Sequence, residues 1–126
     1  LTDFISSELI KKSVMRLRPC NEPDFKDQIN VLINCGKGFS FTSSHAANHF
    51  GLAFLFQALL NSILNLSSKK RYLLTFISFL WAFSIALAQV YVGVHYPLDV
   101  FCGALLGTAL AALTYYIYKV LVNKYL

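Results

Sequence analysis

Three long stretches of this chain contain no aspartate, glutamate, lysine or arginine, and this distribution of charge is the strongest constraint on its fold. The stretches lie between Lys37 and Lys69, between Arg71 and Asp99, and between Asp99 and Lys119. A transmembrane helix needs about 20 mainly apolar residues, and each stretch is long enough to hold one. Only 13% of the residues are charged, whereas soluble domains average about 25%. The sequence therefore predicts a membrane protein. Because the apolar stretches are internal and repeated, they do not resemble a signal peptide.

Apolar periodicity, prolines and polar turns predict an all-α, polytopic membrane helix bundle that forms a single domain over residues 1–126. The expected helices cover residues 1–17, 44–66, 72–90 and 98–122, separated by a loop over 20–42, a turn at 65–71 and a tight connection at 91–97. Pro19 is expected to end the first helix, because the residue before a proline disfavours helical geometry. The last three helices are clear spans and the first is part of another. Because the chain begins without methionine, we expect it to be a fragment with upstream helices missing.

Basic residues predict the orientation of the spans. The turn that contains Lys69, Lys70 and Arg71 and the C-terminal end with Lys119 and Lys124 are separated by two crossings. Cytoplasmic segments are enriched in lysine and arginine, so both are expected in the cytoplasm. The long loop and the 91–97 connection are then outside.

Four cations contradict this trend, because they lie toward the outer end of the first helix: Lys11, Lys12, Arg16 and Arg18. An anionic ligand would explain cations on that side. Acidic residues of the following loop, or segments upstream, could balance them instead.

The polar residues at the outer ends of the helices suggest chemistry. His95 and Asp99 are spaced by four, so in a helix they would share a face. A carboxylate beside an imidazole fixes its tautomer, as in hydrolytic triads. Asp99 could alternatively serve as the N-cap of the last helix. His45 begins the 44–66 helix after Ser43 and Ser44, where backbone N–H groups suit a phosphate and the imidazole could act as general acid.

His49 lies one helical turn after His45 and has a simpler explanation. It belongs to a polar stripe with Gln57, Asn61 and Asn65, which is expected to face other helices.

Three short motifs connect these residues. Lys11, Arg18 and Pro19 match the pattern Lys-x6-Arg-Pro. The segment Thr-Ser-Ser-His at 42–45 matches Pro-Ser-Gly-His in part.

The third motif, Ser-Arg-x5-His-x3-Asp, is matched by His95 and Asp99, with Ala88 and Gln89 in the serine and arginine places. With these motifs in this order, the chain resembles the type 2 phosphatidic acid phosphatase family, relatives of the vanadium haloperoxidases. The resemblance covers residues 11–99 and a C-terminal helix. Family members usually have six membrane helices.

The resemblance implies a metal-independent membrane phosphatase without a cofactor. His95 would attack phosphorus and form a phosphohistidine, Asp99 would orient His95, and His45 would protonate the leaving group and then activate water. The substrate phosphate would be bound by the remaining motif residues: Lys11, Arg18, Ser43, Ser44 and Gln89.

The expected partners are a lipid phosphate substrate and the bilayer, with no nucleic acid. Compact bacterial members of the family act on undecaprenyl diphosphate, phosphatidylglycerol phosphate, phosphatidic acid or lipid A phosphate. The compact loops and the basic turn at 69–71 favour a bacterial inner membrane, and the predicted orientation then places the active site on the periplasmic side.

Three departures from the family pattern matter. Gln89 replaces an arginine and brings no charge, so phosphate affinity is expected to be weaker unless Lys12 or Arg16 substitutes. Thr42 replaces proline. Ser44 replaces a glycine and adds a Cβ where a ligand would approach closely.

The cysteines carry further expectations. Cys20 and Cys35 lie in the same outer loop, where a disulfide is allowed, and they are either bridged or free. Cys102 is expected to be packing filler beside Gly103 and Gly107, whose spacing predicts close helix contact.

Two rival functions remain at this stage. One is a membrane metalloenzyme that uses His45, His49, His95 and Asp99 as ligands. Lys11 and Arg18 nearby would repel such a cation. The other is a lipid-phosphate-binding membrane protein in which Gln89 marks weakened catalysis.

Overall fold

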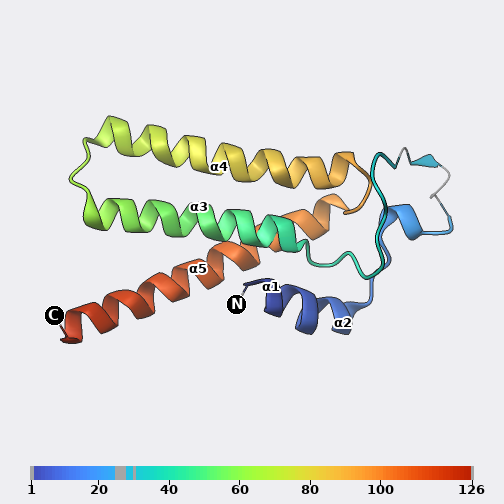
Figure 1. The fold of residues 1–126 in the computed structure, drawn as a ribbon, viewed down its shortest axis with the longest axis horizontal. Helices are drawn as coiled ribbons and strands as arrows, with labels where there is room; N and C mark the ends of the chain where they lie inside the picture. Colours follow the sequence, from blue (N-terminus) through green and yellow to red (C-terminus); the bar gives the residue numbers. More distant parts are fainter. Residues whose placement is uncertain (1, 25–27, 30, 126) are drawn as a thin grey trace.

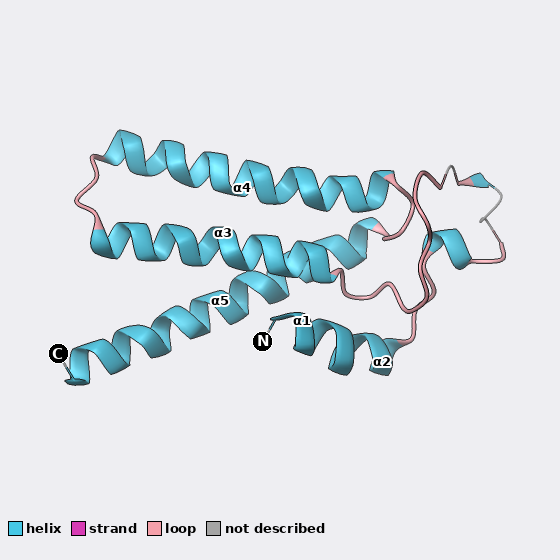
Figure 2. Ribbon diagram, viewed as in Figure 1, coloured by secondary structure: helices cyan, strands magenta, loops and turns pink. Residues whose placement is uncertain are grey.

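The computed structural model describes residues 2–24, 28–29 and 31–125, and every regular element in those ranges is a helix (Figure 2). The all-α prediction is therefore confirmed. Three long helices dominate: α3 (Ser44–Ile63), α4 (Ser68–Tyr91) and α5 (Pro97–Tyr125). A shorter N-terminal helical segment consists of α1 (Thr2–Phe4), a π-helical stretch (Ile5–Ile10) and α2 (Lys11–Val14).

The N-terminal segment ends earlier than predicted. Met15, not Pro19, terminates it, because Met15 adopts the left-handed conformation with a φ of 50°. Its backbone N–H still reaches the carbonyl of Lys11 at 2.9 Å. The chain then becomes extended at Arg18 before a single 3₁₀ turn, Pro19–Asn21.

The other helix boundaries shift by a few residues. α3 ends at Ile63 instead of residue 66, and α4 begins at Ser68 instead of residue 72. Ser67 precedes α4 in an extended conformation, as expected of an N-cap. The basic cluster of residues 69–71 therefore lies in the first turn of α4 and not in a separate turn.

α3 occupies the centre of the bundle, between α4 and α5 (Figure 1). It packs most extensively against α5 and also against α4, whereas α4 and α5 contact each other little. The contact with α5 is close because Gly103 and Gly107 lie in it. A Cβ atom on Gly107 would overlap the Ala47 carbonyl oxygen, and one on Gly103 would overlap that of Ser43. The predicted Gly-x-x-x-Gly packing is confirmed.

The predicted polar stripe on α3 is only partly present. Gln57 is buried, donates to Ser78 Oγ at 3.0 Å and accepts from Thr75 Oγ1 at 3.0 Å, so it joins α3 to α4. Asn61 is exposed, and Asn65 lies beyond the end of the helix. The prediction that Asn61 and Asn65 face other helices, which was made from their spacing of four, was therefore wrong.

In the described part of the chain, two helices, α4 and α5, are long and apolar enough to cross a membrane. Three clear spans were predicted, but α3 does not meet the same test. His45, Asn48, His49 and Gln57 make it more polar. Most of the α4 and α5 surface is not buried against protein, and it exposes large apolar side chains such as Leu80, Phe83 and Leu105. A soluble core helix would bury such residues, so these two helices indicate a membrane protein.

One end of the bundle gathers segments that are distant in sequence. The N-terminus of α3, the connection between α4 and α5, and the loop that follows α2 come together there (Figure 1). The C-terminus lies at the opposite end. All three sequence motifs therefore lie at or near one end of the bundle.

Candidate active site

Asp99 lies in the first turn of α5, and His95 lies two residues before that helix, in the connection from α4. Pro97 occupies the first position of the helix, where a proline costs no hydrogen bond. Asp99 is in the first turn and is not the N-cap that was considered as an alternative. Its Oδ2 instead accepts from the backbone N–H of Tyr96 at 2.9 Å, as the third helical residue does in a capping box.

The histidine and the aspartate face each other in a buried setting. His95 Nδ1 is 3.7 Å from Asp99 Oδ2, and the two side chains are 2% and 0% exposed. This separation is within ion-pair range and longer than a hydrogen bond. Because Nδ1 faces the carboxylate, Nε2 is the nitrogen left to react.

Arg16 is a site residue that sequence reasoning assigned differently. Its Nη1 donates to Asp99 Oδ1 at 3.0 Å, and its guanidinium lies 3.8 Å from the centre of the Tyr96 ring. Arg16 was considered as a phosphate-binding substitute for the arginine that Gln89 replaces. Its observed partner is the carboxylate, so it neutralises Asp99 instead. Sequence gave no signal for this pairing, because the two residues are 83 positions apart.

The remaining cations near the site differ in whether they form an ion pair with a carboxylate. Lys12, the other substitute considered, forms an ion pair with Glu8 on the exposed face of the N-terminal segment. Lys11 and Arg18 have no carboxylate within ion-pair distance in the described part of the chain. Burial, and then the charge of Arg18, lowers the pKa of Lys11. Burial also lowers the pKa of Arg18. A bound anion would offset both effects.

The N-terminus of α3 has its own hydrogen bonds. Ser43 is fully buried and acts as the N-cap, accepting from the backbone N–H of Ala46 at 3.4 Å. The Ser44 hydroxyl lies 2.7 Å from Ser6 Oγ and 3.1 Å from Ser7 Oγ. The serine that replaces the family's glycine thus fastens α3 to the N-terminal segment, a role that the sequence did not suggest.

His45 is exposed at the start of α3 and lies within electrostatic range of His95, Lys11 and Arg18. The structure therefore brings both predicted catalytic histidines and both motif cations to one place. Gln89 lies in the last turn of α4, where its carbonyl accepts from the backbone N–H of His95 at 3.2 Å.

The loop before α3 is fastened to the site by a disulfide and by hydrogen bonds. Cys20 and Cys35 form a disulfide with a Cα–Cα distance of 5.9 Å. The Cys35 carbonyl accepts from Arg18 Nη1 at 3.0 Å, and the Cys20 N–H donates to the Gly93 carbonyl at 3.2 Å. The disulfide therefore holds the loop where it can position Arg18.

Backbone hydrogen bonds also join the motif segments directly. The Ser43 N–H donates to the Asp99 carbonyl at 3.0 Å, which ties the second motif to the third. The N–H of Ser40, a fully buried residue, donates to the Arg16 carbonyl at 2.8 Å, which ties the loop to the first motif.

Three buried side-chain atoms in the described ranges have no hydrogen-bond partner, and each comes from a different motif: Arg18 Nε, Thr42 Oγ1 and His95 Nδ1. Buried polar atoms are usually paired, so three exceptions at one end of the bundle call for an explanation. A cavity of ≈ 220 Å³ also reaches His95, lined by residues that include Pro19, Gly93 and Pro97. Of the three residues, His95 lines this cavity, and its unpaired Nδ1 is the atom that faces Asp99.

The metal-binding alternative finds no geometric support. Within residues 2–24, 28–29 and 31–125, no group of three or more His, Cys, Asp or Glu side chains could hold a metal ion. His49 turns toward α4, where it packs against Trp81 with ring centres 4.8 Å apart. Its Nδ1 lies 2.8 Å from the His45 carbonyl oxygen. It therefore belongs to the helix interface, as predicted.

Comparison with known proteins agrees with this geometry. A lipid A 4′-phosphatase of Bacteroides thetaiotaomicron is 37% identical over 107 residues, covering 83% of this chain and 44% of that protein. A lipid A 4′-phosphatase of Porphyromonas gingivalis is 26% identical over 94% of this chain and 47% of its own length. The bacitracin transport permease protein BcrC of Bacillus licheniformis is 31% identical over 90% of this chain and 51% of its own.

The chain thus spans about half the length of these curated relatives. No solved structure matches it significantly. The sequence profile of the PAP2 superfamily, however, matches residues 1–122, which is nearly the whole chain. The chain belongs to the PAP2 superfamily.

Proposed function

We propose that this chain carries the active site of a membrane lipid phosphatase that works through a phosphohistidine intermediate. One observation supports the proposal above the others: His95 turns Nδ1 toward the buried Asp99, near two cations, Lys11 and Arg18, that have no carboxylate within ion-pair distance in the described part of the chain. This arrangement supplies a nucleophile, its orienting group and a site for a phosphate dianion.

In the first step, His95 Nε2 attacks phosphorus and the bond from phosphorus to the lipid oxygen breaks. His45 gives a proton to the departing oxygen as general acid. Asp99 stabilises the positive charge on the imidazole and keeps Nδ1 protonated, as the aspartate does in hydrolytic triads. In the second step, His45 takes a proton from water, which attacks the phosphohistidine and releases inorganic phosphate.

The phosphate oxygens would be held from two sides. Lys11 and Arg18 supply positive charge, and the N-terminus of α3 supplies backbone N–H groups beside Ser43 and Ser44. Gln89 would contribute a neutral donor at the end of α4. The two serine side chains act through the position of the helix, because their hydroxyls already have protein partners.

The substrate is proposed to be a lipid phosphate or diphosphate. Two relatives are lipid A 4′-phosphatases, which makes a lipid A phosphate the first substrate to test. Undecaprenyl diphosphate, phosphatidic acid and phosphatidylglycerol phosphate are the other candidates. The basic first turn of α4 and the disulfide in the loop support an inner membrane location with the site facing the periplasm.

The test measures phosphate release from these lipids in detergent by the full-length protein, with EDTA present. His95→Ala is expected to abolish release, and His45→Ala to lower kcat by about 10²–10⁴-fold. His49→Ala is the matched control, because His49 packs between helices. It is expected to retain kcat, with folding of each variant checked by its thermal unfolding.

Release that persists in EDTA and is lost only in the His95 and His45 variants would support the proposal. Loss in EDTA, or equal loss in the His49 variant, would favour a metalloenzyme. A well-folded parent that binds lipid phosphate without releasing phosphate would favour the binding protein that Gln89 suggests.

A further inference from the structure

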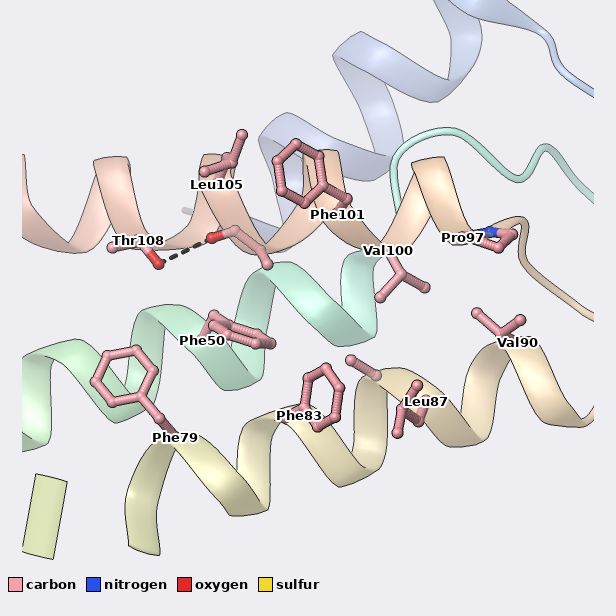
Figure 3. Close-up of a pocket in the computed structure, with 12 residues that line it drawn as sticks. Phe50, Phe79, Phe83, Leu87, Val90, Pro97, Val100, Phe101, Leu105 and Thr108 are labelled. Atoms are coloured by element: carbon pink, nitrogen blue, oxygen red, sulfur yellow. Dashed lines mark hydrogen bonds between the residues drawn. The ribbon is translucent and has the colours of Figure 1, made fainter. Parts of the chain in front are cut away.

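An apolar groove of ≈ 520 Å³ runs between α4 and α5 (Figure 3). It exists because both helices pack on α3 but contact each other little. Phe83 and Leu87 line it from α4, Phe101 and Leu105 from α5, and Phe50 from α3. Its volume lies within the range of about 300–1,000 Å³ that is usual for pockets that bind small ligands.

The lining is suited to hydrocarbon alone. Thr108 has the only polar side chain among the residues that line the groove, and its hydroxyl donates to the Ala104 carbonyl at 2.9 Å. That bond lies within α5, as the dashed line in Figure 3 shows. The groove thus offers no free side-chain donor, and a polar ligand there would lose most of its hydrogen bonds to water.

The groove adjoins the cavity that reaches His95. Val90 and Pro97 line both the groove and the smaller cavity that reaches His95. These two residues stand at the ends of the connection between α4 and α5 that carries His95. A molecule with its phosphate at His95 could therefore place an apolar tail directly in the groove.

The length of the groove fits one leaflet of a membrane. It extends from Val90 to Phe79 along α4 and from Pro97 to Thr108 along α5. At 1.5 Å per residue, each side is about 16 Å long, which is about half of the ~30 Å hydrocarbon core of a bilayer. An acyl chain of the leaflet nearest the site spans this depth.

We propose that the groove between α4 and α5 binds one acyl chain of the lipid phosphate while its phosphate lies at His95. The proposal rests on the proposed phosphatase function and adds a determinant of specificity to it. The enzyme would distinguish lipid phosphates from soluble phosphate esters by the hydrocarbon chain that occupies the groove.

The test uses a substitution that fills the groove in the full-length protein. Ala104 lines the groove, so Ala104→Phe is expected to occupy the space of the chain. Ala109 is exposed on the same helix and is not among the groove residues, so Ala109→Phe is the matched control. The KM of each variant is measured with two phosphatidic acids, one long-chain and one short-chain and water-soluble.

Ala104→Phe is expected to raise the KM for the long-chain lipid roughly tenfold, as loss of hydrocarbon contacts does in other enzymes, and to leave the short-chain KM unchanged. The control should change neither value. An unchanged long-chain KM, or an equal rise for both lipids, would overturn the proposal.

A second measurement does not depend on turnover. Phosphatidic acid with a photoreactive group at the end of its acyl chain is crosslinked to the His95→Ala variant, with and without Ala104→Phe. The proposal is supported if peptides that contain groove residues of α4 and α5 are labelled, and if this labelling disappears when Ala104→Phe is added. Labelling that is the same with and without Ala104→Phe would show only contact with bulk lipid or another apolar segment, and it would overturn the proposal. If the parent releases phosphate from none of the candidate lipids, the proposed function fails and the crosslinking still decides the groove.

Discussion

At the scale of single residues, Asp99 is the point where the motif segments meet. Its carboxylate accepts from Arg16 and from the Tyr96 backbone and faces His95, while its carbonyl accepts from the Ser43 N–H. The carboxylate is fully buried, so a charge there needs compensation from close partners. Arg16 supplies that compensation, and its planar group also covers the Tyr96 ring.

Replacing Arg16 is therefore expected to weaken the site. Arg16→Ala should lower the free energy of unfolding by about 1–2 kcal/mol, because a buried carboxylate loses a donor while solvent still screens part of the effect. Arg16→Lys keeps the charge but not the planar contacts, so its loss should be smaller. Thermal unfolding in detergent measures both, and equal midpoints for parent and Arg16→Ala would contradict the pairing.

Gln89 allows a gain-of-function prediction. Gln89→Arg restores the arginine of the family pattern and should lower the KM for a lipid phosphate several-fold, since charge-assisted bonds are about twice as strong as neutral ones. Phosphate release at a series of substrate concentrations checks this. Gln89→Met is the neutral control and should raise the KM. A KM that rises equally in both variants would show that residue 89 does not face the phosphate.

Sequence reasoning paired His95 with Asp99 on the assumption that both lie in one helix, where four residues make about one turn. The two side chains do face each other, but His95 lies before α5, so the connection between the helices places it. The ion pair between Arg16 and Asp99 could not be found in this way, since it depends on how the loop folds against α5. The bonds from Ser6 and Ser7 to Ser44 depend in the same way on the packing of the N-terminal segment.

At the scale of helices, the close approach of α3 and α5 fixes the site. Gly103 and Gly107 admit the backbone of α3, and the first of them lies against Ser43, the N-cap beside the proposed phosphate site. The spacing of these glycines made the contact predictable. The ends of the helices were less predictable, because Met15 ends α2 through a left-handed conformation that its residue type does not favour.

Enlarging Gly107 is expected to separate the two helices. Gly107→Leu places a side chain against the Ala47 carbonyl and should cost about 1–3 kcal/mol or more, because overpacking displaces backbone. Ala109→Leu, on the exposed face of α5, should stay within about 0.5 kcal/mol of the parent. Thermal unfolding of both variants in the same detergent gives the comparison. Similar midpoints would mean that the helices are not in close contact there.

At the scale of the whole molecule, the polar residues of the candidate site gather at one end of the bundle, and the long helices expose apolar side chains over the rest. The apolar surface was evident from the three uncharged stretches, although among the described residues only α4 and α5 are long and apolar enough to span a membrane. The disulfide lies at the end of the bundle that holds the candidate site. Closing a loop of 15 residues stabilises a fold by about 3 kcal/mol in the chain-entropy account.

Alkylation of the membrane-embedded protein tests this arrangement. Without reductant, we expect an alkylating reagent to modify Cys102 but neither Cys20 nor Cys35, and peptide mapping should recover the last two as one crosslinked species. After reduction, both should be modified. A Cys20→Ser control should free Cys35 for labelling. Full modification of Cys20 without reductant would contradict the disulfide between Cys20 and Cys35.

The bonds that connect the motif segments have a consequence for the history of such a site. The contacts from Ser43 to Asp99, from Cys20 to Gly93 and from Ser40 to Arg16 use backbone atoms, so they do not depend on the side chains at those positions. Substitutions can therefore be accommodated around the candidate site without breaking these bonds. Thr42, Ser44 and Gln89 are three departures from the family pattern in this chain. Backbone bonds of this kind would let side chains at the site differ between relatives while the helices stay in place.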